Sequence, residues 1–211
     1  MDGVLVYPYL RGEIFLRETW LNADPQQQQK LADQLGLFLY ELHRIEAQDL
    51  DFEIPLTLAP ITHETWHDIY ERLVSKVYDL LLPRQIDWVE SLFETALDTP
   101  NFFDFEPVLI HGDLAPEHIL YDPDTVQINS VIDFGVAGLG DPATDLANLI
   151  SSYGETLVTK LGWHYPDLDK LLSRARFDAM AIELQWVLLG VESGEQYWFT
   201  AHLGGPRDMG S

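Results

Sequence analysis

Hydrophobic residues recur every three or four positions over most of the 211-residue chain, which is the spacing of amphipathic helices. We predict helices over residues 24–46, 62–82, 86–97, 140–154 and 166–193, the last as one long helix or two shorter ones. The first begins at Asp24, a good N-cap residue, and Pro25 suits the first helical position. Their apolar stripes suffice for one sizeable core, or for a core with a satellite.

Between residues 108 and 134 the pattern changes to short runs rich in branched residues. The runs cover residues 108–111, 118–122 and 126–134, and turn residues separate them. This pattern predicts a small β patch in which the last two runs form a hairpin. The order of helices, strands and helices therefore predicts an α+β fold that is mainly helical, with a site lined by the strands.

The stretch VLIHGDLAPEHILYD places chemically active side chains at the ends of these strands. Asp113 follows a strand and a glycine, His118 comes five residues later, and Asp133 ends the third run. The predicted hairpin would bring His118 and Asp133 together, facing the same space as Asp113. Two carboxylates and an imidazole in one cleft suit phosphoryl transfer, in which positioning and charge compensation supply most of the catalysis.

The motifs HGDLAPEHIL and IDFG together resemble those of the aminoglycoside phosphotransferase and choline kinase superfamily, which has a protein-kinase-like fold. The segment GDPATDLANL resembles the family's loop-bracing helix, VYPYLRGE its hinge, and ELHRIE the end of the helix that follows the hinge. The likeness runs from about residue 4 to residue 155 and is most specific over residues 108–146.

This resemblance implies a role for each motif residue. Asp113 would be the catalytic base that accepts or orients the acceptor hydroxyl, and Asp133 the principal ligand of Mg²⁺. His118 stands where most relatives have a second metal-binding asparagine, and His111 and Asp145 would brace the loop. ATP or GTP would be the phosphate donor.

Histidine at position 118 departs from the usual pattern, which reads H-G-D-x-x-x-x-N. Mg²⁺ prefers oxygen ligands, so the second metal position is in doubt while the first is not. The branch that resembles aminoglycoside 2″-phosphotransferases also carries histidine here, which favours that branch.

A kinase of this type also needs a glycine-rich loop over the phosphates and a lysine on a strand. The chain's lysines, at positions 30, 76, 160 and 170, all follow the hinge-like residues 1–10 and lie in helical patterns. We therefore expect residues 11–211 to form the helical C-terminal lobe, which carries catalysis and substrate binding. The N-terminal nucleotide lobe would be absent from this chain or supplied by a partner chain, and the isolated chain would be inactive.

The charge balance indicates which ligands the chain favours. It has 35 acidic residues against 12 Lys and Arg, a formal charge of −23, which disfavours nucleic acid and anionic membranes. The same charge would attract a cationic small molecule. Candidate substrate contacts are Glu183, Glu192, Glu195 and Trp198, although an ordinary solvated helix face and a packed aromatic explain them better. We expect a cytoplasmic protein, because no apolar run approaches the roughly 20 residues that span a bilayer.

Several functions remain open at this level. An aminoglycoside is the favoured acceptor, and choline, homoserine, a macrolide or a sugar are rivals within the kinase class. Outside that class, the chain could capture cationic ligands without transferring phosphate. Metal-dependent hydrolysis by Asp113, His118 and Asp133 is a weaker rival, since the other histidines show no ligand-type pairing with this loop.

Overall fold

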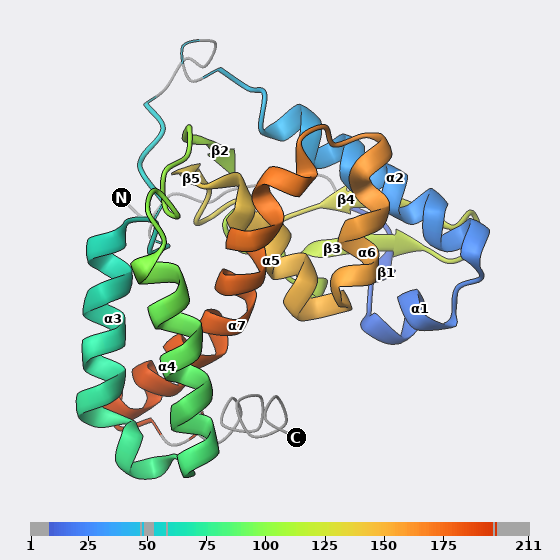
Figure 1. The fold of residues 1–211 in the computed structure, drawn as a ribbon. Coiled ribbons are helices and arrows are strands. Elements are labelled where there is room, and N and C mark those ends of the chain that lie inside the picture. Colours follow the sequence, from blue (N-terminus) through green and yellow to red (C-terminus); the bar gives the residue numbers. More distant parts are fainter. Residues whose placement is uncertain (1–8, 47, 49–52, 58, 196, 198–211) are drawn as a thin grey trace, which may run out of the picture.

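The structure is a computed structural model that describes residues 9–197, except for 47, 49–52, 58 and 196. It shows a mainly helical α+β fold, which confirms the predicted class (Figure 1). Residues 1–8 of the hinge-like segment 1–10 lie outside the described part. No described helix has the length and apolar character needed to cross a membrane.

The helices are α1 (Arg17–Asn22), α2 (Pro25–Leu42), α3 (His63–Lys76), α4 (Pro83–Asp98), α5 (Pro142–Tyr153), α6 (Glu155–Lys160) and α7 (Leu168–Ser193). The strands are β1 (Glu13–Ile14), β2 (Val108–Ile110), β3 (Ile119–Asp122), β4 (Gln127–Val131) and β5 (Gly138–Gly140). Short 3₁₀ turns cover Tyr78–Leu80, Pro116–His118 and Leu161–Trp163. The five predicted helices are therefore present, and the last is continuous, whereas α1, α6, β1 and β5 were not predicted.

Local sequence explains where the main helices begin. The Asp24 carboxylate accepts hydrogen bonds from the backbone N–H groups of Gln26 and Gln27 at 2.9 Å, and the Gln27 side chain accepts one from Asp24 N–H. This capping box starts α2 where the sequence predicted. The helix predicted over 62–82 instead ends at Lys76, and the exposed Leu80 belongs to the following 3₁₀ turn.

The strands form two small antiparallel sheets, with the orders β1-β3-β4 and β2-β5. The β3–β4 hairpin confirms the predicted pairing of these two runs and places Ile119 opposite Val131. Strand β2 pairs with β5, so that Val108 lies opposite Gly140. The second sheet holds the start of the HGD loop against the chain that follows Asp133.

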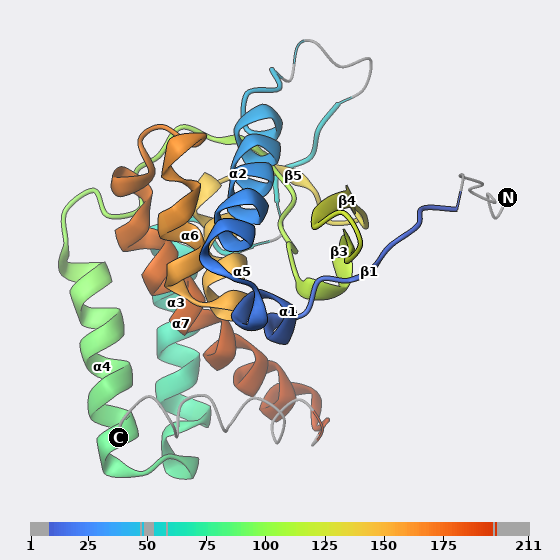
Figure 2. The ribbon, with the colours of Figure 1, turned by 90° about the vertical axis from the view of Figure 1, so that its right-hand side faces the viewer.

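Two apolar cores are joined by α7. One lies among α2, α5, α6 and β3 and includes Trp20, and the other lies among α3, α4 and α7 and includes Trp66 and Phe93. The N-terminal part of α7 packs into the first core, and its later turns, from Phe177 onward, pack into the second. Figures 1 and 2 show α7 passing from beside α5 and α6 to the α3–α4 pair.

Candidate active site

The HGD loop begins where β2 ends and turns sharply at Gly112. Gly112 has φ +81°, in the left-handed region that side chains disfavour, and a Cβ there would lie 3.2 Å from the Val136 carbonyl oxygen. The turn brings Asp113 to the surface, where 54% of its side chain is exposed. A buried strand thus delivers an accessible carboxylate.

Asp145, at the start of α5, anchors this loop from below. Its carboxylate is fully buried and accepts hydrogen bonds from the backbone N–H groups of His111 at 2.9 Å and Gly112 at 2.8 Å. His43 Nε2 lies 3.0 Å from the same carboxylate. The loop backbone is therefore held by one buried charge rather than by sheet hydrogen bonds alone.

His111 joins the two halves of the site. Its ring is buried, with Nε2 donating a hydrogen bond to the Ile132 carbonyl at 2.9 Å and Nδ1 accepting one from Asp113 N–H at 3.3 Å. The residue before Asp133 is thus tied to the backbone of Asp113. These contacts link the backbone at Asp113 to the end of the third run.

His118 lies between the two exposed carboxylates. Its Nδ1 donates to the Asp113 carbonyl at 2.7 Å and lies 3.6 Å from Asp113 Oδ2, and its Nε2 lies 3.5 Å from Asp133 Oδ2. The structure therefore brings the side chains of Asp113, His118 and Asp133 together.

Asp133 itself has an unusual backbone. Its φ is +65°, a region that residues other than glycine rarely occupy, and 63% of its side chain is exposed. Such strained residues persist where the surroundings hold them, and they cluster at functional sites. Here the turn directs the Asp133 carboxylate toward His118.

Two supporting residues were missed from the sequence. His43, at the end of α2, is buried between Asp145 and the Tyr165 hydroxyl, which lies 2.6 Å from His43 Nδ1. Burial and the nearby Asp145 charge raise the pKa of the Tyr165 hydroxyl. The available signal was a histidine at the end of an apolar helix stripe, which sequence reasoning set aside because it has no metal-ligand spacing with the loop.

A cavity of about 1030 Å³ opens beside the loop, with Gly112 and Asp113 in its wall. Its other walls come from the segment 56–62 and from α3, α5 and α7. Among the predicted substrate residues, Glu192 lines this cavity, but Arg72 and Lys76 bind its carboxylate at 2.5 and 2.7 Å. These bonds lower the pKa of Glu192 to about 2.

The remaining substrate candidates have different positions. Glu183 and Glu195 are not among the residues that line this cavity, and Trp198 lies outside the described residues. The lining face of α7 carries Asp178, Ile182 and Gln185 instead. Helical spacing relates these three residues, but the sequence alone does not say which face of α7 meets the cavity.

The side chains that could hold a metal are few. Within the described part of the chain, no group of three or more His, Asp or Glu side chains could hold a metal ion. Protein-bound Mg²⁺ commonly keeps several waters and uses one or two carboxylates together with substrate phosphates. The exposed carboxylates of Asp113 and Asp133 fit such a nucleotide-borne Mg²⁺, and they do not form a closed protein cage.

Sequence comparison assigns the family. The profile of the phosphotransferase enzyme family matches residues 2–176. The chain belongs to this family. An aminoglycoside 3'-phosphotransferase of Streptomyces ribosidificus is 26% identical over 153 residues, which cover 67% of this chain and 56% of that protein. A second, from Streptomyces fradiae, is 28% identical over 142 residues, covering 62% and 52%. The chain spans about half the length of these curated relatives.

Solved structures share the fold of this phosphotransferase-family chain. The GDP complex of wild-type aminoglycoside 2'-phosphotransferase-IIIa superposes with a TM-score of 0.85 at 24% identity. The match covers 96% of this chain and 68% of that one. A GDP and kanamycin complex of APH(2")-IIia gives a TM-score of 0.83 at 23% identity, with 96% and 69% covered. The superfamily and the kinase-like fold predicted from the motifs are thereby confirmed.

Proposed function

We propose that the protein is a small-molecule phosphotransferase that moves the γ-phosphate of ATP or GTP to a hydroxyl of a cationic acceptor, with an aminoglycoside favoured. One observation carries this proposal: His118 lies within 3.6 Å of both exposed carboxylates, Asp113 and Asp133, and Asp113 lines a large cavity. A donor phosphate and an acceptor hydroxyl could meet at this point.

In this proposal the chain's own groups act mainly by position and charge. Asp113 accepts or orients the proton of the attacking hydroxyl, because its carboxylate is exposed at the cavity wall. Asp133 would hold Mg²⁺, and that ion would supply positive charge to offset the charge on the transferred phosphate. His118 orients both carboxylates, and any metal contact would use Nε2, since Nδ1 donates to the Asp113 carbonyl.

An aminoglycoside acceptor agrees with the charge of the cavity. Five acidic residues line its walls against one basic residue, Arg72, which pairs with two of them; the acids are Glu64, Asp68, Asp113, Asp178 and Glu192. A polycationic ligand gains from this field, whereas a neutral sugar or homoserine would gain less. The names of the curated relatives point to the same ligand class.

A macrolide is a second candidate, favoured by the apolar parts of the same cavity. Leu56, Ile61, Val136, Ile182 and Leu189 line it together with the acids. Two macrolide 2'-phosphotransferases share the fold, with TM-scores of 0.62 and 0.63. A panel of kanamycin, a macrolide, choline and glucose, assayed for phosphate transfer, separates these acceptors.

We also propose that residues 11–211 form the catalytic and acceptor-binding lobe, and that a nucleotide lobe from another segment covers the phosphates. No lysine of the described residues lines the cavity or forms an ion pair with Asp113 or Asp133; this holds for Lys30, Lys76, Lys160 and Lys170. Calorimetric titration of this chain with Mg-ATP and Mg-GTP tests the proposal, and micromolar affinity would refute it.

The decisive test of the function is Asp113→Asn in the full-length protein. We expect the rate of kanamycin phosphorylation to fall by about 10²–10⁴, because the amide cannot accept a proton at the acceptor hydroxyl. Asp124→Asn, in the exposed β3–β4 turn, is the matched control and should keep the native rate. Unchanged turnover in Asp113→Asn would end the assignment.

A further inference from the structure

The floor of the cavity, between α5 and α7, carries a polar side chain without a partner. Asn148, on α5, lines the cavity and is only 7% exposed. Its amide nitrogen has no hydrogen-bond partner among the described residues. A buried donor left unpaired is destabilising, so this amide weakens the free chain unless something binds it.

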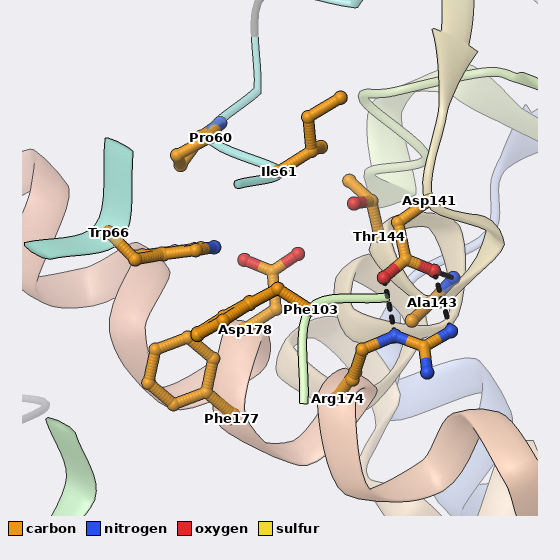
Figure 3. A pocket seen from close by; sticks show the side chains of 10 residues that line it. All are labelled: Pro60, Ile61, Trp66, Phe103, Asp141, Ala143, Thr144, Arg174, Phe177 and Asp178. Atoms are coloured by element: carbon orange, nitrogen blue, oxygen red, sulfur yellow. Dashed lines mark hydrogen bonds and ion pairs between the residues drawn. The ribbon is translucent and has the colours of Figure 1, made fainter. Parts of the chain in front are cut away.

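Asp178, on the neighbouring helix α7, lines the same cavity and is a second polar group whose burial is unfavourable. It lines the large cavity and also a small adjoining pocket, in which Figure 3 shows its carboxylate directed into the space between Trp66 and Thr144. Burial raises the pKa of Asp178 to about 7, a hydrogen bond with Thr144 offsets part of this shift, and the Asp141 charge adds to it.

The basic residue that lines the small pocket, Arg174, already forms an ion pair with another carboxylate. Arg174 makes two bonds with Asp141, at 2.6 and 3.1 Å, which Figure 3 shows as dashed lines leading away from Asp178. Arg72, on the α3 wall, is held by Asp68 at 2.9 Å and by Glu192.

The other charged groups that face this space are also acidic. They are Glu64 and Asp68 on α3, Asp141 on α5, Glu192 on α7 and Asp113 on the loop. The segment 56–62 adds no charge of its own to the lining. A cation that reached Asp178 would therefore lie among more acidic than basic side chains.

We propose that Asn148 and Asp178 form an inner subsite that binds an amino alcohol of the acceptor, with an ammonium group on Asp178 and a neighbouring hydroxyl oxygen on the Asn148 amide. The proposal rests on the proposed function, because it takes the cavity beside Asp113 as the acceptor site. An ammonium group neutralises the half-buried Asp178 carboxylate, and the hydroxyl supplies the acceptor atom that the amide lacks. Acceptors without an adjacent amine and hydroxyl bind this floor poorly.

The same reasoning predicts opposite effects on stability and on binding. The folded-state pKa of Asp178 is raised, so the favourable contribution of its protonated form is complete below about pH 4 and is lost as the pH rises through about 7. At pH 8, Asp178→Asn should therefore raise the melting temperature, while below pH 4 it should change little. Asn148→Leu should also leave the free chain as stable or more stable, because it removes an unpaired buried amide.

The experiment measures both quantities on the 211-residue chain at pH 8. Kanamycin is titrated by calorimetry, and thermal unfolding is followed by circular dichroism. We expect Asp178→Asn to weaken kanamycin binding at least tenfold and Asn148→Leu about fivefold, with no loss of melting temperature in either. Asp79→Asn, an exposed residue outside the cavity, is the matched control and should change neither quantity. Asn148→Ala repeats the test if the leucine variant does not fold.

Two results would overturn the subsite. One is native-like kanamycin affinity in Asp178→Asn, or no kanamycin binding by the unaltered chain. The other is a parallel fall of affinity and melting temperature, which marks a purely structural role. In the full-length protein, Asp178→Asn should raise the KM for kanamycin with little change in kcat. If the KM of the full-length Asp178→Asn variant is unchanged while Asp113→Asn is inactive, the subsite proposal is wrong and the phosphotransferase assignment stands.

Discussion

Asp145 shows how a single buried residue positions the reactive part of the loop. Its two oxygens accept hydrogen bonds from the backbone N–H groups of His111 and Gly112, and one of them lies 3.0 Å from His43 Nε2. The Asp145 side chain is fully buried. Hydrogen bonds to a charged group contribute about 1.5–3 kcal/mol each, so this carboxylate is worth more than an ordinary helix residue. Its bonds set the backbone that presents Asp113.

We predict that Asp145→Asn lowers the free energy of unfolding by about 2–4 kcal/mol. The asparagine side chain keeps one acceptor oxygen, but its NH₂ group replaces the other. That NH₂ group would face a backbone N–H of the loop or the His43 ring, so at least one buried donor would lose its acceptor. Urea denaturation followed by tryptophan fluorescence measures the loss.

Asp79→Asn, on the exposed turn after α3, is the control for this change and should stay within about 0.5 kcal/mol of the native chain. An Asp145→Asn protein as stable as this control would show that the carboxylate charge is not needed to hold the loop.

At the scale of elements, strand β5 controls how the segment 55–57 meets the HGD loop. Leu139 exchanges backbone hydrogen bonds with this segment, from Leu139 N–H to the Pro55 carbonyl at 2.9 Å and from Thr57 N–H to the Leu139 carbonyl at 3.0 Å. A Cβ on Gly138 would lie 2.8 Å from Pro55 O and from Thr57 N. The segment can approach this closely because position 138 lacks a side chain.

We predict that Gly138→Ala destabilises the chain by about 1–3 kcal/mol, since backbone atoms must move to accept the methyl group. Leu56 and Thr57 line the cavity, so kanamycin affinity should fall as well. Gly162→Ala is the matched control, because its Cβ would meet nothing closer than a leucine methyl group at 3.8 Å. Equal melting temperatures in the two variants would contradict the prediction.

The elements also show why sequence reasoning succeeded for one sheet and failed for the other. The β3–β4 pairing joins runs of branched residues that are neighbours along the chain, so local pattern and turn residues were enough to predict it. Strand β5 is Gly-Leu-Gly, which has no strand-like pattern, and it forms because β2 and the segment 55–57 lie beside it. Such pairing depends on distant partners rather than on local preference.

At the scale of the whole molecule, the dominant property is charge. The chain has a formal charge of −23, so its exposed acidic side chains repel one another. This repulsion is stronger in the compact folded state than in the unfolded chain, and it therefore lowers the free energy of unfolding. The same charge draws cations toward the cavity. Salt screens both effects within about 10 Å at 0.1 M.

We predict that raising NaCl from about 0.02 M to 0.5 M increases the melting temperature by several degrees and slows association with kanamycin. A variant with Asp79, Glu94 and Asp124 changed to lysine, all exposed in the native chain, should show a smaller salt-induced gain. Stopped-flow binding and thermal melts measure the two effects. A melting temperature independent of salt in both proteins would exclude charge repulsion as a major cost.

The sequence by itself determined the five long helices, though not all of their ends, the β3–β4 hairpin and the grouping of Asp113, His118 and Asp133. These features depend on residues within about 25 positions of one another, where capping, turn residues and side-chain period act locally. Only the tertiary structure decided which side chains form the cavity. The packing of α7 against α5 and α3 turns Asp178 and Gln185 to the cavity, rather than Glu183, and pairs Glu192 with Arg72. The rotation of a long helix depends on both cores at once, so no local pattern contains it.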